Sequence, residues 1–327
     1  MTKTIELLEN EQFKLFNYPC EEILNNIENK SVQLICIDPP YNIKKSDWDD
    51  KWGKVKKGYY PKKEKFDDYY EWLSNIFEIL SIKLKDNGSF FFFHNDFRIM
   101  AKLDEEIQKK TNLIFKQFII WNKRFDVSSK KGFLDGFIVR EKLNNWNKMA
   151  EYILFYTFDN SWKLKEERKK RNISQQTIQR EILSKNGNIT GWYSNIETGK
   201  NLPTKETIKP ITKHLGLTIE DLVPKYHNLK KDHSVWNYDF DNDKKEHETQ
   251  KPISLIENII SHTTDENDIV LDCFMGSGTT GVACKNLKRK FIGIEKEKKF
   301  FELSKNRILG QYNKESDLKN HFDKKFY

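Results

Sequence analysis

The chain has 327 residues, enough for one large domain or two smaller ones that bury a substantial core. It carries 57 Lys and Arg against 49 Asp and Glu, and the net charge of +8 favours a polyanionic partner such as a nucleic acid. The four cysteines lack zinc-site spacing, so no metal is implied, and no run approaches the roughly 18 apolar residues of a membrane span. The N-terminus has no signal-peptide core, and we therefore expect a cytoplasmic protein that does not cross a membrane.

Strand and helix patterns alternate along most of the chain. The apolar run 32–37 stops at two prolines, which predicts a buried parallel strand that ends at a rigid loop. Helical spacing over 69–84 predicts a helix that ends at Asn87-Gly88. Further strands are predicted at 89–93, 115–121, 151–157, 269–272 and 291–295, and further helices at 97–109, 252–261, 280–287 and 298–309. This alternation predicts an α/β fold with a Rossmann-like, doubly wound sheet.

The sequence pattern changes in the middle of the chain. Residues 162–226 contain no strand-like run and predict several short helices, after which the strand and helix alternation returns. We therefore expect two halves of one α/β core, residues 1–161 and 229–327, that are interrupted by an all-α insert at 162–228.

The first motif with chemical meaning is Asp38-Pro39-Pro40-Tyr41, which follows the predicted strand at the edge where open α/β sheets bind ligands. An aromatic amino group is a poor nucleophile because its lone pair is delocalised into the ring. The Asp38 carboxylate and the Pro39 carbonyl could accept its two hydrogens, while the prolines hold both acceptors rigid. Tyr41 would stack on a base that has been rotated out of the duplex. The alternative interpretation is a strand-ending Pro-Pro turn with incidental neighbours.

The second motif is the glycine-rich turn at 271–280, which again connects a predicted strand to a helix. Gly276 and Gly278 permit close backbone approach, and the helix start offers free N–H groups to a polar ligand. Glu295 ends the next strand, where an acidic residue can bind the hydroxyls of a ribose. A P-loop would need Lys where Val282 stands, whereas the spacing does fit a dinucleotide fingerprint. Alone, this motif indicates an adenosine-containing cofactor.

Together the two motifs resemble the beta group of amino-methylating DNA methyltransferases, in which the motif order is circularly permuted and the catalytic motif precedes the cofactor motif. The resemblance covers roughly residues 13–160 and 233–310, and 247–252 is similar to the segment that borders the family's cofactor pocket. Cys273 replaces a usual Pro, Pro19-Cys20 replaces an acidic residue before Cys or Ala, and Glu151 follows Ala150 instead of His. The cofactor-binding residues that the resemblance implies are Cys20, Lys251, Asp272, Phe274, Gly276, Ser277, Gly278, Thr279 and Glu295, and the catalytic ones are Asp38, Pro39, Pro40 and Tyr41.

The resemblance implies transfer of a methyl group from S-adenosyl-L-methionine to the 6-amino group of adenine in double-stranded DNA, with base flipping. Asp38 points to adenine, because the cytosine-amino enzymes usually have Ser at that position. A cytosine-amino or RNA methyltransferase, and a transcriptional regulator on an inactive scaffold, are the alternatives. Methylation at cytosine carbon-5 is a further rival, because Cys20 follows Pro19 and that chemistry uses a Cys nucleophile. The sequence does not reveal whether the protein has a cognate restriction endonuclease as a partner or whether it forms a homodimer.

The predicted insert begins with a basic stretch, 162–171, and is similar to the helix-turn-helix domain of phage-repressor-type regulators. Ser174 and Thr190 are expected N-caps, the second helix is longer than usual, and the helix from about Thr190 would enter the major groove. The expected DNA contacts are Lys169, Lys170, Arg171, Gln175, Gln176, Asn188, Thr190 and Asn195. The hypothesis is that the insert helps to select the methylation site, and its competitor is a regulatory module that binds an operator.

Overall fold

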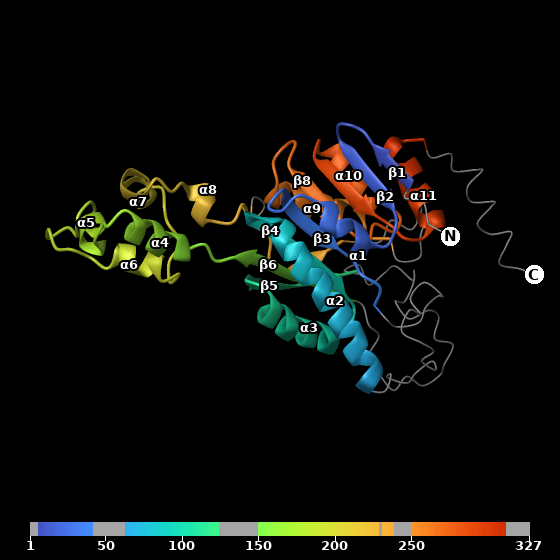
Figure 1. Ribbon diagram of the computed structural model, residues 1–327, viewed down its shortest axis with the longest axis horizontal. Helices are drawn as coiled ribbons and strands as arrows, with labels where there is room; N and C mark the ends of the chain where they lie inside the picture. The colour runs from blue at the N-terminus through green and yellow to red at the C-terminus, as the bar shows by residue number, and fades with distance from the viewer. Residues whose placement is uncertain (1–5, 42–62, 124–149, 229–230, 239–249, 312–327) are drawn as a thin grey trace, which may run out of the picture.

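The computed structural model describes residues 6–41, 63–123, 150–228, 231–238 and 250–311. Its centre is a nine-stranded sheet in the order β1-β2-β9-β8-β3-β4-β6-β5-β7 (Figure 1). The strands are β1 (Glu6–Glu9), β2 (Phe13–Asn17), β3 (Val32–Ile37), β4 (Leu84–His94), β5 (Leu113–Asn122), β6 (Ala150–Phe158), β7 (Val235–Asn237), β8 (Ile269–Asp272) and β9 (Lys290–Ile294). The strand order alternates between the two ends of the chain, so the two halves form one core.

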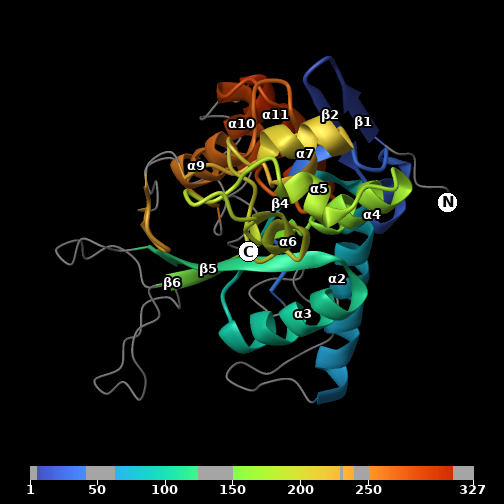
Figure 2. The ribbon, with the colours of Figure 1, turned by 90° about the vertical axis from the view of Figure 1, so that its left-hand side faces the viewer.

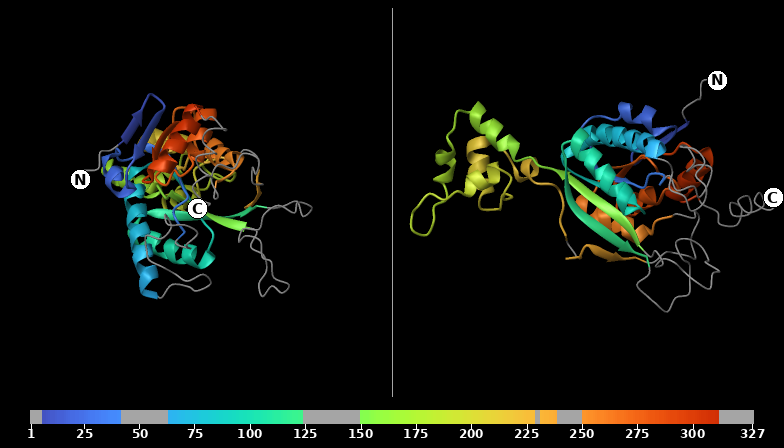
Figure 3. Two further views of the ribbon diagram at one scale, coloured as in Figure 1. Left: turned by 90° about the vertical axis from the view of Figure 1, so that its right-hand side faces the viewer. Right: turned by 90° about the horizontal axis from the view of Figure 1, so that it is seen from below.

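Helices cover both faces of the sheet, as a doubly wound fold requires (Figures 1 and 3). The run 90–93 explains why both faces attract helices, because successive side chains of a strand point to opposite faces. Phe90 and Phe92 join one buried cluster, and Phe91 and Phe93 join the other. The first cluster contains residues of α1 (Cys20–Ile23), η1 (Leu24–Asn26), α2 (Lys63–Lys83) and α3 (Phe97–Lys110), and the second contains residues of α9 (Ile253–Thr263), α10 (Thr279–Asn286) and α11 (Lys298–Leu309).

The sheet is mixed rather than purely parallel. The strands β2, β9, β8, β3 and β4 pair in parallel, but β6 is antiparallel to both β4 and β5, and β1 is antiparallel to β2. Short β1, β2 and β7 were not among the predicted elements. The predicted helix stop at Asn87-Gly88 is wrong, because α2 ends at Lys83 and these residues lie inside β4.

Five short helices connect β6 to β7 and lie to one side of the sheet (Figures 1 and 2). They are α4 (Trp162–Lys170), α5 (Gln175–Gln179), α6 (Trp192–Glu197), α7 (Ile208–Leu215) and α8 (Ile219–Leu222). These helices share a buried cluster of their own, in which Leu164, Tyr193 and Ile211 are fully buried. We call residues 162–228 the helical insert. Its all-helical texture agrees with the sequence pattern.

Inside the helical insert the connection between α5 and α6 differs from the prediction. Ser174 does cap α5, because its hydroxyl accepts the Thr177 N–H at 3.1 Å. However, α5 ends at Gln179, so the expected long helix is wrong, and an isolated β-bridge pairs Leu183 with Ile189. A turn closes this bridge because Gly187 adopts a left-handed φ of 76°. The N-cap of α6 is consequently Gly191 rather than Thr190.

No helix in the described ranges is long and apolar enough to cross a membrane.

Candidate active site

The two motifs meet because β3 and β8 are neighbours in the sheet. Leu34 pairs with Val270 and Ile35 with Leu271 in a parallel ladder, so both strands end at the same edge. The catalytic motif continues directly from β3, and the glycine-rich turn continues from β8. Parallel pairing therefore brings together two segments that are separated by more than 200 residues of chain.

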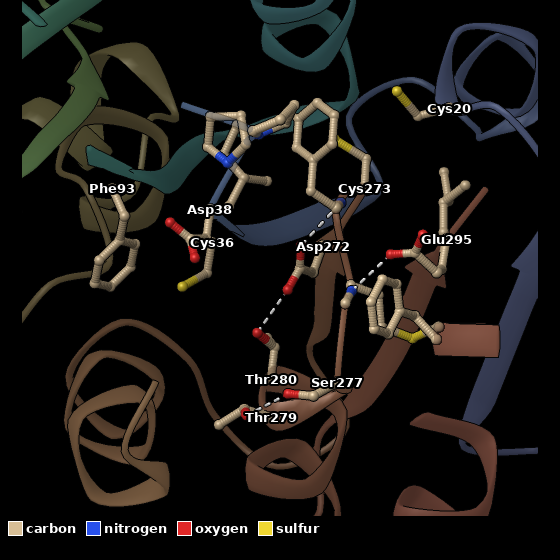
Figure 4. A pocket seen from close by; sticks show the side chains of 18 of the residues that line it. Cys20, Cys36, Asp38, Phe93, Asp272, Cys273, Ser277, Thr279, Thr280 and Glu295 are labelled. Atoms are coloured by element: carbon tan, nitrogen blue, oxygen red, sulfur yellow. Dashed lines mark hydrogen bonds between the residues drawn. The ribbon is translucent and has the colours of Figure 1, made fainter. Parts of the chain in front are cut away.

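A cavity of about 390 Å³ lies at this edge and is shared by both motifs. Figure 4 shows Asp38 on one side of the cavity and Glu295 on the other, with Asp272 between them. A volume of this size accommodates a small-molecule cofactor. The predicted residues that line it are Cys20, Asp38, Pro39, Pro40, Tyr41, Lys251, Asp272, Phe274, Gly276, Ser277, Thr279 and Glu295. Gly278 does not line the cavity, and its role lies elsewhere.

The Asp38 carboxylate is held by two side chains. One oxygen accepts the Tyr41 hydroxyl, and the other forms an ion pair with the Lys251 ammonium. The Lys251 ammonium also lies 3.4 Å from one carboxylate oxygen of Glu151, and the other oxygen of Glu151 pairs with Lys123. The four charged groups alternate in sign along the order Asp38, Lys251, Glu151, Lys123. Lys251, which was predicted to bind the cofactor, lines the cavity, and its ammonium contacts the Asp38 carboxylate.

The pKa values of this chain of charges follow from burial and pairing. Burial raises the pKa of Asp38, although the Lys251 charge opposes the shift. The pKa of Glu151 falls to about 2, because the attraction of Lys251 and Lys123 outweighs its desolvation. Desolvation lowers the pKa of Lys123 to about 8, against the pull of Glu151. The carboxylates thus depend on the buried lysines to stay ionised.

The prolines and Tyr41 differ in what they offer to a ligand. The Pro40 carbonyl accepts the Tyr69 hydroxyl at 2.9 Å. By contrast, Pro39 lines the cavity, and no hydrogen bond to its carbonyl forms within the described part of the chain. The Tyr41 ring lies 4.6 Å from the His94 ring, centroid to centroid. Among the described residues the Pro39 carbonyl therefore remains an available acceptor beside Asp38, and its role toward an amine stays a prediction.

The glycine-rich turn is organised by two carboxylates. Asp272 accepts the Phe274 N–H at 3.0 Å and the Thr280 hydroxyl at 2.7 Å, and burial raises the pKa of Asp272 to about 7. Glu295 accepts the Gly276 N–H at 2.9 Å and a second backbone N–H at 2.9 Å. Burial raises the pKa of Glu295 as well. Each Glu295 oxygen keeps an unused lone pair, so the carboxylate can still accept hydroxyl donors.

The two glycines of the turn serve different purposes. Gly278 has a φ of 79°, and a Cβ there would lie 2.7 Å from the Cβ of Ser304 in α11. Its missing side chain allows two helices to pack closely. Gly276 has a φ of 53°, and the nearest atom to an added Cβ is the Phe274 oxygen at 3.8 Å. Only Gly276 leaves space on its cavity side.

Several residues of the site were not predicted as site residues. Glu151 was noted only as a departure from the family pattern, and it pairs with Lys123 and Lys251, which come from other segments of the chain. Trp72 lines the cavity beside Phe274, with ring centroids 5.8 Å apart, and its indole N–H donates to Glu21 at 2.7 Å. A single sequence gives no sign of such contacts.

Cys20 lies in the cavity wall at the start of α1, and its thiol donates a hydrogen bond to a Glu21 oxygen at 3.5 Å. The acidic group at the end of β3 is Asp38, which holds a lysine. This arrangement supports chemistry at an amino group more than attack by a Cys nucleophile.

The predicted DNA contacts of the helical insert lie apart from the cavity, and none of them lines it. Gln175 is used internally, because its amide donates to the buried Glu197 carboxylate, which also binds Arg168 at 2.7 Å. Arg171 pairs with Glu167 at 3.2 Å but stays exposed. The remaining predicted contacts are exposed or half-buried, and they are Lys169, Lys170, Gln176, Asn188, Thr190 and Asn195.

Comparison with known proteins agrees with this geometry. Residues 32–306 match the N6_N4_Mtase family model, which is described as DNA methylase. The chain is 29% identical over 290 residues to the type II methyltransferase M1.MboII of Moraxella bovis, covering 86% of this chain and 91% of the relative. It is 25% identical to M2.DpnII of Streptococcus pneumoniae, covering 88% and 86%.

Solved structures share the fold. The complex of M1.HpyAVI with SAM superposes with a TM-score of 0.52 at 22% identity, covering 90% of this chain and 99% of that one. The cytosine-N4-specific PvuII DNA methyltransferase superposes with a TM-score of 0.59 at 14% identity, covering 95% and 90%. With the family model matching most of its length, and with both motifs at one cavity, the chain belongs to the N6_N4 family of DNA methylases.

Proposed function

We propose that this protein transfers a methyl group from S-adenosyl-L-methionine to the 6-amino group of adenine in double-stranded DNA. The observation that carries the proposal is the single cavity of about 390 Å³ that joins the Asp38 carboxylate to the glycine-rich turn. Asp38 in the first motif position favours adenine over cytosine, as the resemblance implies. The catalytic residues are Asp38, Pro39, Pro40 and Tyr41.

The end of the cavity that lies opposite Asp38 suits the cofactor. Glu295 is fixed by two backbone N–H groups and keeps lone pairs for the two hydroxyls of a ribose. Ser277 and Thr279 supply hydroxyls, and Phe274 supplies an apolar wall. When bound, S-adenosyl-L-methionine supplies an activated methyl group on a sulfonium centre. The other proposed contacts of the cofactor are Cys20, Asp272 and Gly276, while Gly278 shapes the turn and Lys251 acts through Asp38.

The catalytic half of the cavity acts on the amino group. Asp38 and the Pro39 carbonyl each accept one N–H of the target amine, which shifts the nitrogen toward tetrahedral geometry and exposes its lone pair. No nucleophile and no metal are required, because the nitrogen itself attacks. The proton that the nitrogen loses can be held at the Asp38 carboxylate, whose raised pKa makes it a better acceptor.

Lys251 and Tyr41 each contact one oxygen of the Asp38 carboxylate. A carboxylate accepts about four hydrogen bonds, so the amine can join these contacts or replace one of them. Release of the Tyr41 hydroxyl would free its ring to stack on the flipped base, at the cost of one hydrogen bond. Lys251 is then a positioning residue, which keeps Asp38 ionised and aimed at the cavity.

The direct test is to express the chain in a bacterial host that lacks adenine and cytosine amino-methylation. Modified bases are then mapped by single-molecule sequencing, with an Asp38→Ala strain as the matched control. We expect 6-methyladenine within one short sequence context, and its absence in the control strain. Genomic DNA without modification in either strain would contradict the proposal.

The second candidate is methylation of the 4-amino group of cytosine. The same acceptor pair could hold either amine, and the cytosine-N4-specific PvuII enzyme shares the fold. The sequencing experiment separates the two outcomes, because 4-methylcytosine in the same host would replace adenine as the target.

The proposal extends to the architecture of the chain, to the helical insert and to partner proteins. The chain order of the motifs follows the circularly permuted beta group, and the core divides at 1–161 and 229–327 around the helical insert. The helical insert is a helix-turn-helix-like DNA-binding module, whose exposed Lys169, Lys170 and Arg171 contact phosphates and whose Gln176 and Asn188 face bases. A cognate endonuclease and a homodimer are partners that pull-down and sedimentation experiments can test.

A further inference from the structure

The helical insert leaves the core at the end of the sheet opposite the cavity, where β4 begins and β6 ends. Because β6 is antiparallel to β4, its last residue, Phe158, lies near the start of β4, while the catalytic motif lies at the level of Phe92. Asn87, which contacts the insert, precedes Phe92 by five residues, or about 17 Å of strand at 3.3 Å per residue. Figures 1 and 3 show the insert extending farther away from that end of the sheet.

The base of the helical insert is fixed at two adjacent residues near the start of β4. Asn160, just before α4, donates its amide to the Asp86 carbonyl at 2.7 Å, and Lys163 pairs with the Asp86 carboxylate at 2.5 Å. On the return path, the Lys225 N–H donates to the Asn87 carbonyl at 2.7 Å. The two ends of the insert therefore contact adjacent residues of β4, and the insert cannot swing to the cavity without breaking these contacts.

The helical insert also carries most of the net charge. Residues 162–228 contain 13 Lys and Arg against 7 Asp and Glu, a net charge of +6 out of +8 for the whole chain. Within the described ranges, seven of its basic side chains are exposed and form no ion pair, so their charge is available to a partner. They are Lys165, Lys169, Arg180, Lys185, Lys200, Lys205 and Lys209.

We propose that the helical insert binds a second stretch of double-stranded DNA, separate from the duplex whose base enters the cavity. The proposal rests on the proposed function only in assigning the first duplex to the cavity. Exposed lysines attract phosphates, and the exposed amides of Gln176 and Asn188 can reach base edges, which a purely electrostatic patch could not do. The opposite-edge location favours the operator-type role over selection of the methylation site.

The test counts duplexes per chain. Sedimentation velocity with fluorescent duplexes of about 16 bp, roughly one and a half helical turns, measures the stoichiometry at low salt. The wild-type chain should bind two duplexes, and K165E/K185E/K200E should bind one. If each of the three lysines contacts one phosphate, the variant's summed salt dependence should weaken by at least about 2.7 in log–log slope. The matched control, K116E/K285E/K290E, makes the same charge change on the core and should still bind two.

Methylation in the host provides the second readout. The insert variant should modify the same sequence at a rate within about twofold of the wild type, since its three lysines lie far from the cavity. One duplex per wild-type chain, a changed methylated sequence in the variant, or preference for an RNA hairpin over duplex DNA would each overturn the proposal. If the proposed methylation fails instead, the host DNA stays unmodified while the duplex count still reports on the insert.

Discussion

The two edges of the central sheet use charge in opposite ways. At the cavity edge, Lys251 is 7% exposed and Lys123 is 3% exposed, and each is paired with a carboxylate. At the other edge, the helical insert displays exposed basic side chains without ion-pair partners in the described structure. Buried pairs fix the geometry of reacting groups, whereas exposed unpaired charges attract a polyanion from solution. The comparison shows why net charge predicts a partner but does not locate the chemistry.

The largest expected effect is at Asp38. We expect Asp38→Ala to lower kcat by at least about 10³-fold, because the acceptor for the target amine is lost. The Kd for S-adenosyl-L-methionine, measured by calorimetry, should stay within about twofold, since the glycine-rich turn is untouched. Loss of cofactor binding in this variant would mean that the two halves of the cavity are not separable.

Lys251→Met should have the next largest effect. The substitution leaves two buried carboxylates, Asp38 and Glu151, without their shared cation, which should lower the free energy of unfolding by about 3–5 kcal/mol. The pKa of Asp38, already raised by burial, should rise further, so the acid limb of the kcat/KM profile moves to higher pH. Activity should therefore recover as the pH rises.

The control for this variant is Lys85→Met, which breaks a partly exposed pair with Asp268 at 3.3 Å. That change should cost less than about 1 kcal/mol and leave the pH profile unchanged. Lys251→Arg, which keeps the charge, should restore the wild-type acid limb. An unshifted profile in Lys251→Met would show that Lys251 does not control Asp38.

Glu151→Gln tests the inner end of the charge chain. A carboxyl with a lowered pKa stabilises the fold above its unfolded pKa, and that stability is lost as pH falls toward the folded value of about 2. We expect the variant to be about 3 kcal/mol less stable at pH 7, converted at 1.36 kcal/mol per pKa unit. The difference from wild type should shrink below about pH 4.3, as urea titrations at several pH values would reveal. A difference independent of pH would contradict this account.

The smallest effects are expected at the two glycines, and they should differ in kind. Gly278→Ala should cost about 2–3 kcal/mol, because the new Cβ meets Ser304 and the φ is left-handed. Gly276→Ala should cost only about 1 kcal/mol of stability but weaken cofactor binding, since its Cβ enters space at the cavity. Thermal melts with and without cofactor separate the two. The reverse ranking would exchange their assigned roles.

The sequence was most informative where chemistry and local pattern coincide. The strand 32–37, the strand 269–272 and the helix 298–309 were predicted with their observed bounds, and both motifs reach the same cavity. Strand direction was not predictable, because the run 151–157 is equally apolar in a parallel or an antiparallel position. That direction alone decides that the helical insert lies at the far edge.

The charge chain could not be predicted for a related reason. Glu151 lies in β6 and Lys123 directly follows the adjacent strand β5, whereas Lys251 comes from a segment about 100 residues after Glu151. No spacing rule joins them. The bridge between Leu183 and Ile189 was missed because five residues around Gly187 offer too little periodicity to distinguish a turn from a helix.

The shared attachment at Asp86 and Asn87 has a practical consequence for protein engineering. Since the chain leaves and returns beside two adjacent residues of β4, residues 162–222 could be exchanged for another folded module with neighbouring ends, without cutting a strand of the sheet. A methylase whose insert is replaced by another DNA-binding module could be targeted to chosen genomic sequences, while the cavity at the opposite end of the sheet stays unchanged.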